Sequence, residues 1–454
     1  MSFIETTRML FDHVSHASFS VLKPGEALNL DLYAEEQTYI RFNRAQIRQA
    51  TAVAQRNLGV TFQGDGRTIQ FAVDLTGSLE QDAAFVRSLL ERARAEASVL
   101  PEDPFLVPIK NNGSSDIQYQ ADHPFESDWI KQIISAVEGV DFAGLLSKGP
   151  QIKAVRNSAG QDHWFCSDSF FIDYSLYTVN ASGENKAVKD LYADRAWSLE
   201  HFCKAIGHGK NQLELLKRSA RRLSAGEYRV YLAPAALESI VGIFSWGAVS
   251  YDAWKKGQSG LQKLIEGNAF FSEKFSLQEN FRLGLAPQFN SLGELAPMEL
   301  PIIQQGQLKN LLVNSRTAKE FKIPSNGADN VGWKGEGLRS AEVNGGDLPE
   351  AKVLQHLDNG IYLSNLHYLN WSDPQTARLT GMTRYACFWV DHGEIVAPIH
   401  DLRFDESLYR IFGSCLDALT AETRLFPSTE TYQRRDLSGC KVPGAIVDNF
   451  RFTL

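Results

Sequence analysis

The sequence predicts an α+β protein with two domains, an N-terminal α/β meander domain at residues 1–225 and a β-rich C-terminal domain at residues 226–454. Three observations lead to this prediction. The chain has 454 residues, more than one hydrophobic core usually supports. Helical and strand-like hydrophobic patterns alternate in the first half, whereas short apolar runs separated by Gly, Pro and Asn-Gly pairs fill the second.

The first hundred residues predict a helix, a β-meander and a second helix. Apolar residues at three- and four-residue spacing indicate the first helix, and alternating ones indicate the strands. The helix carries Ile4, Leu10, Phe11 and Val14, the strands are expected at 28–34, 39–43, 58–63 and 68–73, and the second helix runs from Leu79 to Ala97. Gly64-Asp65-Gly66 between the last two strands is a hairpin signal.

The pattern continues with a helix around Trp129 to Val137 and strands at 151–156 and 170–179. A basic-faced helix is then expected through Leu213, Leu216, Ala220 and Leu223. Gly226 ends it, and 228–232 reads as a strand, which places the domain boundary near Gly226. Asn326-Gly327, Asn344-Gly345 and Asn359-Gly360 favour a β-rich second domain.

Composition excludes several classes of protein. The net charge of -8 offers no surface that would attract phosphate, so nucleic acid is not an expected partner. No apolar run approaches the ~20 residues of a membrane span, and the first ten residues lack the pattern of a secretion signal. The five cysteines have no close pairs, which is typical of reduced thiols. We therefore expect a cytoplasmic protein.

The usual hydrolase motifs are missing. The chain contains no His-Glu-x-x-His, no Gly-x-Ser-x-Gly and no Gly-x-x-x-x-Gly-Lys segment. His201, Cys203 and His208 carry donor atoms suitable for zinc, but their spacing matches no common zinc motif, and partly buried core residues are the commoner explanation. His392 and His400 flank a short segment and would approach each other on paired strands, although exposed hairpin histidines are the commoner explanation.

A glycine-rich loop is a weak candidate for binding. Gly332, Gly335 and Gly337 would let backbone amides approach an anion, and Trp333 and Lys334 would contact a peptide. An ordinary exposed loop tip is the default interpretation.

Two blocks in the second half carry a family resemblance. The first, residues 287–321, contains Asn290, Gly293, Glu294, Gly306, Leu308, Leu312, Ser315, Thr317 and Ala318 at the matching positions. The second, residues 360–412, contains Thr380, Gly381, Gly393, Glu394, Ile395 and Pro398. Both resemble segments of the TldD/PmbA family, and residues 41–50 resemble a strand of that family's first domain. The resemblance implies the same α+β and β-rich pair of domains.

The resemblance also implies that a zinc site has been lost. Catalytic members carry a His-Glu-x-x-x-His motif on a helix after an apolar strand. Counting back from Gly257-Gln258-Ser259 places Gly242 and Gly247 at the histidine positions and Ile243 at the glutamate position. Cys440 resembles a further zinc ligand near the C-terminus of catalytic members, but one thiol cannot hold zinc alone. We therefore assign no catalytic residue and no metal ligand.

The function implied by the resemblance is that of a non-catalytic subunit. In this family a metal-free chain pairs with a TldD-type chain, which holds the zinc, and the complex degrades or matures unfolded peptides. A heterodimer or higher oligomer is expected, or a homodimer when the chain is alone.

Two alternatives remain open at this point. One is a peptide-binding or regulatory protein without peptidase activity, in keeping with the family's older description as a modulator of DNA gyrase. The other is a metallopeptidase with a relocated metal, using Cys440, His392 or His400.

Overall fold

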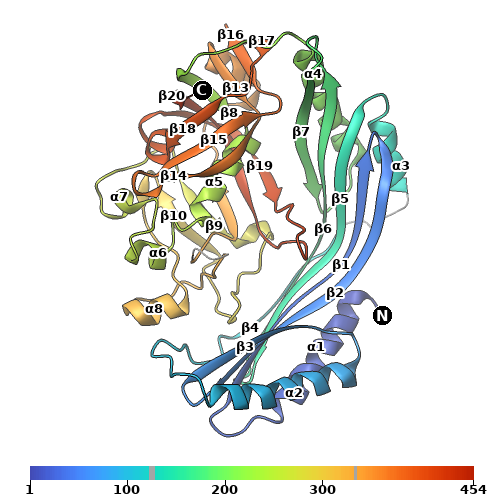
Figure 1. The fold of residues 1–454 in the computed structure, drawn as a ribbon, viewed down its shortest axis with the longest axis vertical. Helices are drawn as coiled ribbons and strands as arrows, with labels where there is room; N and C mark the ends of the chain where they lie inside the picture. The colour runs from blue at the N-terminus through green and yellow to red at the C-terminus, as the bar shows by residue number, and fades with distance from the viewer. Residues whose placement is uncertain (122–127, 332–334, 454) are drawn as a thin grey trace.

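Two large β-sheets with helices packed against them form the molecule (Figure 1). The computed structural model describes residues 1–121, 128–331 and 335–453. Within these ranges the first sheet has seven strands and the second has 13. The predicted α+β fold is confirmed, and the second half of the chain is rich in strands as expected.

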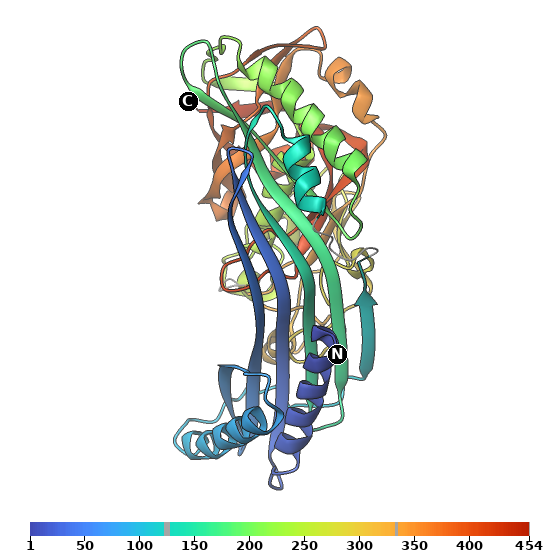
Figure 2. The ribbon, with the colours of Figure 1, turned by 90° about the vertical axis from the view of Figure 1, so that its right-hand side faces the viewer.

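The first sheet is built from long strands that twist along much of the height of the molecule (Figure 2). Its order is β3-β2-β1-β5-β6-β4, with β7 paired to β6. The strands are β1 (Ala27–Asn43), β2 (Gln46–Gly64), β3 (Arg67–Asp74), β4 (Ser114–Tyr119), β5 (Asp141–Asn157), β6 (Asp162–Val179) and β7 (Asn185–Asp194). The predicted hairpin is present, since Asp65 and Gly66 join β2 to β3 with φ of 50° and 71°. Positive φ at both residues is what a two-residue hairpin turn requires.

Helices α1 (Phe3–Phe19) and α2 (Leu79–Ala97) cover one end of this sheet (Figure 1). Ser2 and Glu5 form a capping box that starts α1. The apolar face of α1 packs on the alternating residues of β1, and α2 packs on β2, β3 and α1. These buried residues include Leu10, Phe11, Val14, Leu28, Leu30, Leu32, Ala34, Ala83, Val86 and Leu90.

Helices α3 (Asp128–Ala136) and α4 (Leu199–Leu216) pack at the other end of the sheet. The prediction that a helix continues from Leu213 through Leu223 was wrong, because α4 ends at Leu216. The reason is a tertiary contact: the backbone N–H of Arg221 donates to Pro398, and Arg221 in turn accepts from His400. Among the described residues, no helix has both the length and the apolar character needed to cross a bilayer.

The second sheet surrounds the central strand β8 (Gly226–Leu232). β8 pairs parallel with β13 (Gly360–Leu363) and antiparallel with β20 (Gly439–Phe452). The other strands are β9 (Leu277–Asn280), β10 (Glu299–Gln304), β11 (Gln307–Leu308), β12 (Ser340–Val343), β14 (Asn365–Asp373), β15 (Arg378–Arg384), β16 (Phe388–Asp391), β17 (Glu394–Pro398), β18 (Arg403–Ser407) and β19 (Leu416–Pro427). The first sheet therefore uses strands before residue 195 and the second uses strands from Gly226 onward.

A loop at residues 428–438, which we call the strap, joins β19 to β20 and reaches across to the first sheet. Its Arg435 is fully buried there. The backbone N–H of Arg435 donates to Glu35 at 2.9 Å, and its guanidinium donates to the backbone oxygen and the hydroxyl of Ser169 at 2.8 and 2.9 Å. The strap thus connects the two sheets through strands β1 and β6.

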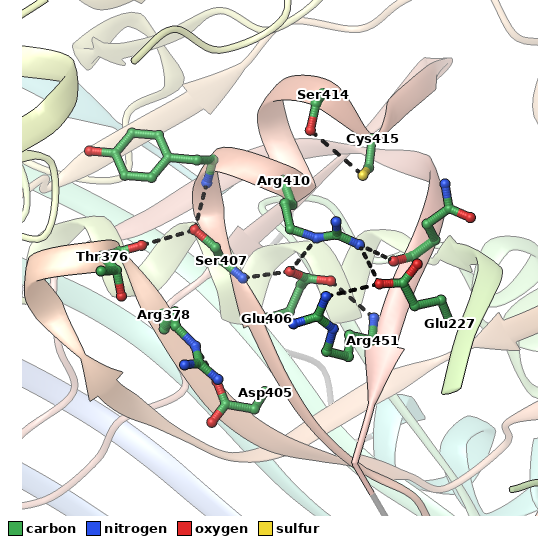
Figure 3. A network of polar contacts seen from close by, with 12 residues as sticks. Glu227, Thr376, Arg378, Asp405, Glu406, Ser407, Arg410, Ser414, Cys415 and Arg451 are labelled. Atoms are coloured by element: carbon green, nitrogen blue, oxygen red, sulfur yellow. Dashed lines mark hydrogen bonds and ion pairs between the residues drawn. The ribbon is translucent and has the colours of Figure 1, made fainter. Parts of the chain in front are cut away.

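A polar network connects β8, β18 and β20 (Figure 3). The buried Glu406 accepts hydrogen bonds from the side chain of Arg410 and from the backbone N–H of Ser407 and Arg451. Glu227 accepts from the guanidinium groups of Arg410 and Arg451 at 3.2 and 3.0 Å. Removing Glu406 would leave three donors without this acceptor.

We expect Glu406→Ala to lower the free energy of unfolding by about 2–3 kcal/mol, because hydrogen bonds to a buried charged group are worth more than neutral ones. Asp405→Ala is the matched control. Asp405 pairs with Arg378 at 3.0 Å nearer the surface, so its loss should cost less than about 1 kcal/mol. Urea unfolding measures the loss in free energy of unfolding for both variants, and equal losses would contradict the prediction.

Candidate functional site

Helix α5 (Pro234–Gly242) follows directly from the central strand β8. Pro234 occupies its first turn, where the missing N–H costs nothing. Ala236, Leu237 and Ile240 face the core of the second sheet. The opposite face carries Ala235, Glu238, Ser239 and Gly242, at the i, i+3, i+4, i+7 spacing of one helix side.

That opposite face lines a cavity of about 720 Å³ between the two sheets. The first sheet contributes Asp173, Lys189 and Asp190. The second contributes α5, the start of β14, the end of β19, the strap and the start of β20. The volume is within the range of small-molecule and peptide-side-chain sites.

The structure brings two of the predicted site positions to this cavity. Gly242 and Cys440 both line it, from α5 and β20. Ile243 and Gly247 are not among the described lining residues. Ile243 starts the short 3-10 helix η1 (Ile243–Ser245) and is 1% exposed, and Gly247 follows with φ of 85°.

These residues do not fit a zinc ion. Gly242 offers no side-chain donor and Ile243 is aliphatic. Burial, and secondly the nearby carboxyl of Glu238, raises the pKa of the Cys440 thiol well above its usual range, so the thiolate that zinc binds is disfavoured. Among the described residues, no group of three or more His, Cys, Asp or Glu side chains is placed to hold a metal ion. Structural zinc sites use four protein ligands and catalytic sites three.

Glu238 and Ser239 are cavity residues that the sequence reasoning missed. The Ser239 hydroxyl contacts the Glu238 carboxylate and the backbone oxygen of Ala235, both at 3.2 Å. Burial raises the pKa of Glu238. The polar face of the helix, with Glu238 and Ser239 three and four residues after Ala235, was a signal in the sequence that would have indicated them.

Acidic residues of the first sheet stand on the other side of the cavity with cationic partners. Lys189 contacts Asp173 at 2.5 Å, and Arg424 of β19 contacts Asp190 at 2.6 Å. The second pair joins the two sheets at the cavity wall. His367 from β14 and Tyr385 complete the polar lining.

The histidine and cysteine candidates lie elsewhere. His201, Cys203 and His208 are exposed on α4. His392 lies at the tip of the turn between β16 and β17, whereas His400 lies beyond the far end of β17. The hairpin therefore does not bring these two side chains together.

Val331 and Leu338, which flank the glycine-rich loop, line the cavity. Gly332, Trp333 and Lys334 are outside the described residues. Gly335 has φ of 88°, and a Cβ there would lie 2.7 Å from the Ser250 hydroxyl. A Cβ on Gly337 would lie 2.8 Å from Val331, so both glycines are explained by close packing.

The chain is similar to known proteins in sequence and in fold. Residues 225–454 match the sequence model of a family described as the PmbA/TldA metallopeptidase C-terminal domain. A search of curated proteins gives no match. The fold is similar to TldE from Thermococcus kodakarensis, with 14% identity, a TM-score of 0.78 and coverage of 98% of this chain and 100% of that one.

Two further solved structures share the fold. A putative modulator of a DNA gyrase from Thermotoga maritima has 15% identity and a TM-score of 0.73, with both chains covered completely. A putative modulator of DNA gyrase from Bacteroides thetaiotaomicron has 13% identity and a TM-score of 0.77, with 98% of each chain covered.

Proposed function

Because this chain belongs to the PmbA/TldD family of metallopeptidase-related proteins, we propose that it is the non-catalytic subunit of a TldD-type zinc peptidase complex. The partner subunit supplies the zinc and the general base, and the complex degrades or matures unfolded peptides in the cytoplasm. One observation carries the proposal: the cavity beside α5 is formed, but the motif positions Gly242, Ile243 and Gly247 have no side chains that bind metal.

In this proposal the chain helps to bind the peptide. Strand β14 enters the cavity with Asn365, Leu366 and His367. Within the described strands β14 pairs with β15 alone, so its other edge has backbone groups for an added strand. An extended peptide is bound well by such an edge because main-chain hydrogen bonds do not depend on its sequence.

The zinc content of the purified chain tests the proposal. We expect less than about a tenth of an equivalent per chain, before and after mild chelation, because stable zinc binding needs several convergent ligands. The chain alone should not cleave an unfolded peptide, and adding a TldD-type partner should produce cleavage. A full equivalent of zinc that resists chelation would sink the proposal and direct attention to Cys440.

Co-purification separates this proposal from a regulatory role without a peptidase. When the tagged chain is expressed in its native host and purified, a TldD-type protein should co-elute with it in size-exclusion chromatography. Recovery of a homodimer alone, together with no cleavage when the partner is supplied, would favour the regulatory role.

A further inference from the structure

The cavity beside α5 has an excess of negative charge. Among its described lining residues, five carry carboxylates and one, Lys189, carries a lysine or arginine cation. The carboxylates are Asp173, Asp190, Glu238, Glu430 and Asp436. A site lined in this way attracts cations and repels anions.

Of these five described acids, Glu238 is partly buried and has no described ion pair. Glu430 and Asp436 are exposed. Lys189 is engaged by Asp173, and Arg424 is engaged by Asp190. Asp436 accepts from the hydroxyl of Ser438 on the strap. The described contact of the Glu238 carboxylate is the neighbouring Ser239 hydroxyl at 3.2 Å, a neutral donor.

Glu238 also sits where a carboxylate is costly. It lines the cavity together with Ala235, Val241 and Leu338, and its charge contributes to the raised pKa of the Cys440 thiol. Burial disfavours the charged form, as the raised pKa of Glu238 indicates. A cation bound in the cavity would stabilise the charged Glu238 carboxylate, as water does for an exposed carboxylate.

We infer that this cavity binds a primary ammonium group of a peptide, with Glu238 as the anion and the apolar wall contacting the adjoining side chain. The inference rests on the proposed peptide-binding function and names the chemistry of the bound segment. An ammonium fits because it donates charge-assisted hydrogen bonds to a carboxylate. The ammonium has two sources, the amino terminus of the peptide or a lysine side chain.

Four versions of one eight-residue peptide without other charges test the inference by calorimetric titration of the full-length chain. They are the free amino terminus, the acetylated terminus, the acetylated terminus with one lysine, and the acetylated terminus with norleucine in place of that lysine. We expect at least one ammonium peptide to bind about tenfold tighter or more than its uncharged counterpart. The arm that gains affinity identifies the source.

Two variants locate the effect. Glu238→Gln should remove the preference for ammonium, whereas Glu273→Gln, the same change at an exposed position outside the cavity, should retain it. Thermal unfolding checks that Glu238→Gln folds, and we expect it to be at least as stable as the parent because a partly buried carboxylate without a described cationic partner is replaced by a neutral amide.

The outcomes distinguish the inference from the proposed function. Binding of all four peptides with equal affinity overturns the ammonium site and keeps peptide binding. Absence of binding in all four contradicts both. A preference for ammonium that survives Glu238→Gln overturns the assignment to Glu238.

Discussion

Arg435→Ala is expected to lower the free energy of unfolding by about 2–4 kcal/mol, because it removes the buried side chain that connects the strap to the first sheet. The variant leaves the hydroxyl and backbone oxygen of Ser169 without the guanidinium that now donates to them. It also leaves an empty volume beside Phe171, whose ring lies 5.1 Å from the guanidinium carbon. Urea unfolding measures the loss.

The charge of Arg435 is retained in the folded protein. Burial lowers the pKa of Arg435 to about 10, and Tyr33, Tyr39, Glu35 and Asp168 oppose that shift. The guanidinium therefore stays protonated at neutral pH, and the pairing with Ser169 should hold up to about pH 9. The pKa of Arg435 is lower in the folded than in the unfolded protein, so the unfolded state takes up the proton first as the pH decreases. The free energy of unfolding should therefore fall slowly as the pH decreases from well above 10 to below it.

Arg434→Ala is the matched control for the strap. Arg434 is exposed, and its guanidinium lies 4.2 Å from the ring of Tyr33. A cation–π contact at an exposed site is worth about 0.5–1 kcal/mol, so this loss should be smaller than that of Arg435. Equal losses in the two variants would show that the buried guanidinium does not hold the strap.

Local pattern was enough to predict much of the first domain. The spacing of Leu10, Phe11 and Val14 predicted α1 without help from the rest of the chain, and the structure adds a capping box of Ser2 and Glu5 at its start. Alternation in β1 predicts its buried face because side chains of a strand point to opposite sides. The end of α4 was not predictable in this way, since the contact of Arg221 with Pro398 joins residues far apart in the sequence.

Some of the residues that line the cavity were named from the sequence and others were missed. The family resemblance indicated Gly242 and Cys440, and these two line one cavity. Glu238 was missed because counting residues back from Gly257 fixes a distance along the chain, whereas the side of α5 that faces the cavity follows from helix geometry. The acids of β6 and β7 come from the other sheet, so sequence spacing carries no information about them.

Phe244, which directly follows α5, belongs to a cluster of phenylalanine rings, and Phe412→Ala is expected to destabilise the protein by about 3–5 kcal/mol. Phe412 is fully buried in the π-helix η5 (Arg410–Ser414), and its ring stacks on Phe275 with centroids 4.2 Å apart. Its ring also lies 5.7 Å from that of Phe244, which directly follows α5 in η1. Alanine would leave a cavity beside Phe244 and remove this packing contact at the end of α5.

Phe412→Leu removes the aromatic ring but keeps most of the volume of the side chain, so it distinguishes loss of packing beside α5 from loss of the ring itself. Leucine keeps most of the volume, so its cost should be less than about 1.5 kcal/mol. Urea unfolding gives the loss in free energy of unfolding for both variants. Calorimetric titration with the acetylated peptide shows whether the cavity is kept. We expect the leucine variant to bind the peptide as the parent does and the alanine variant to bind more weakly, since α5 supplies one wall of the cavity. If both variants bind equally well while differing in stability, the phenylalanine cluster stabilises the second sheet without positioning α5.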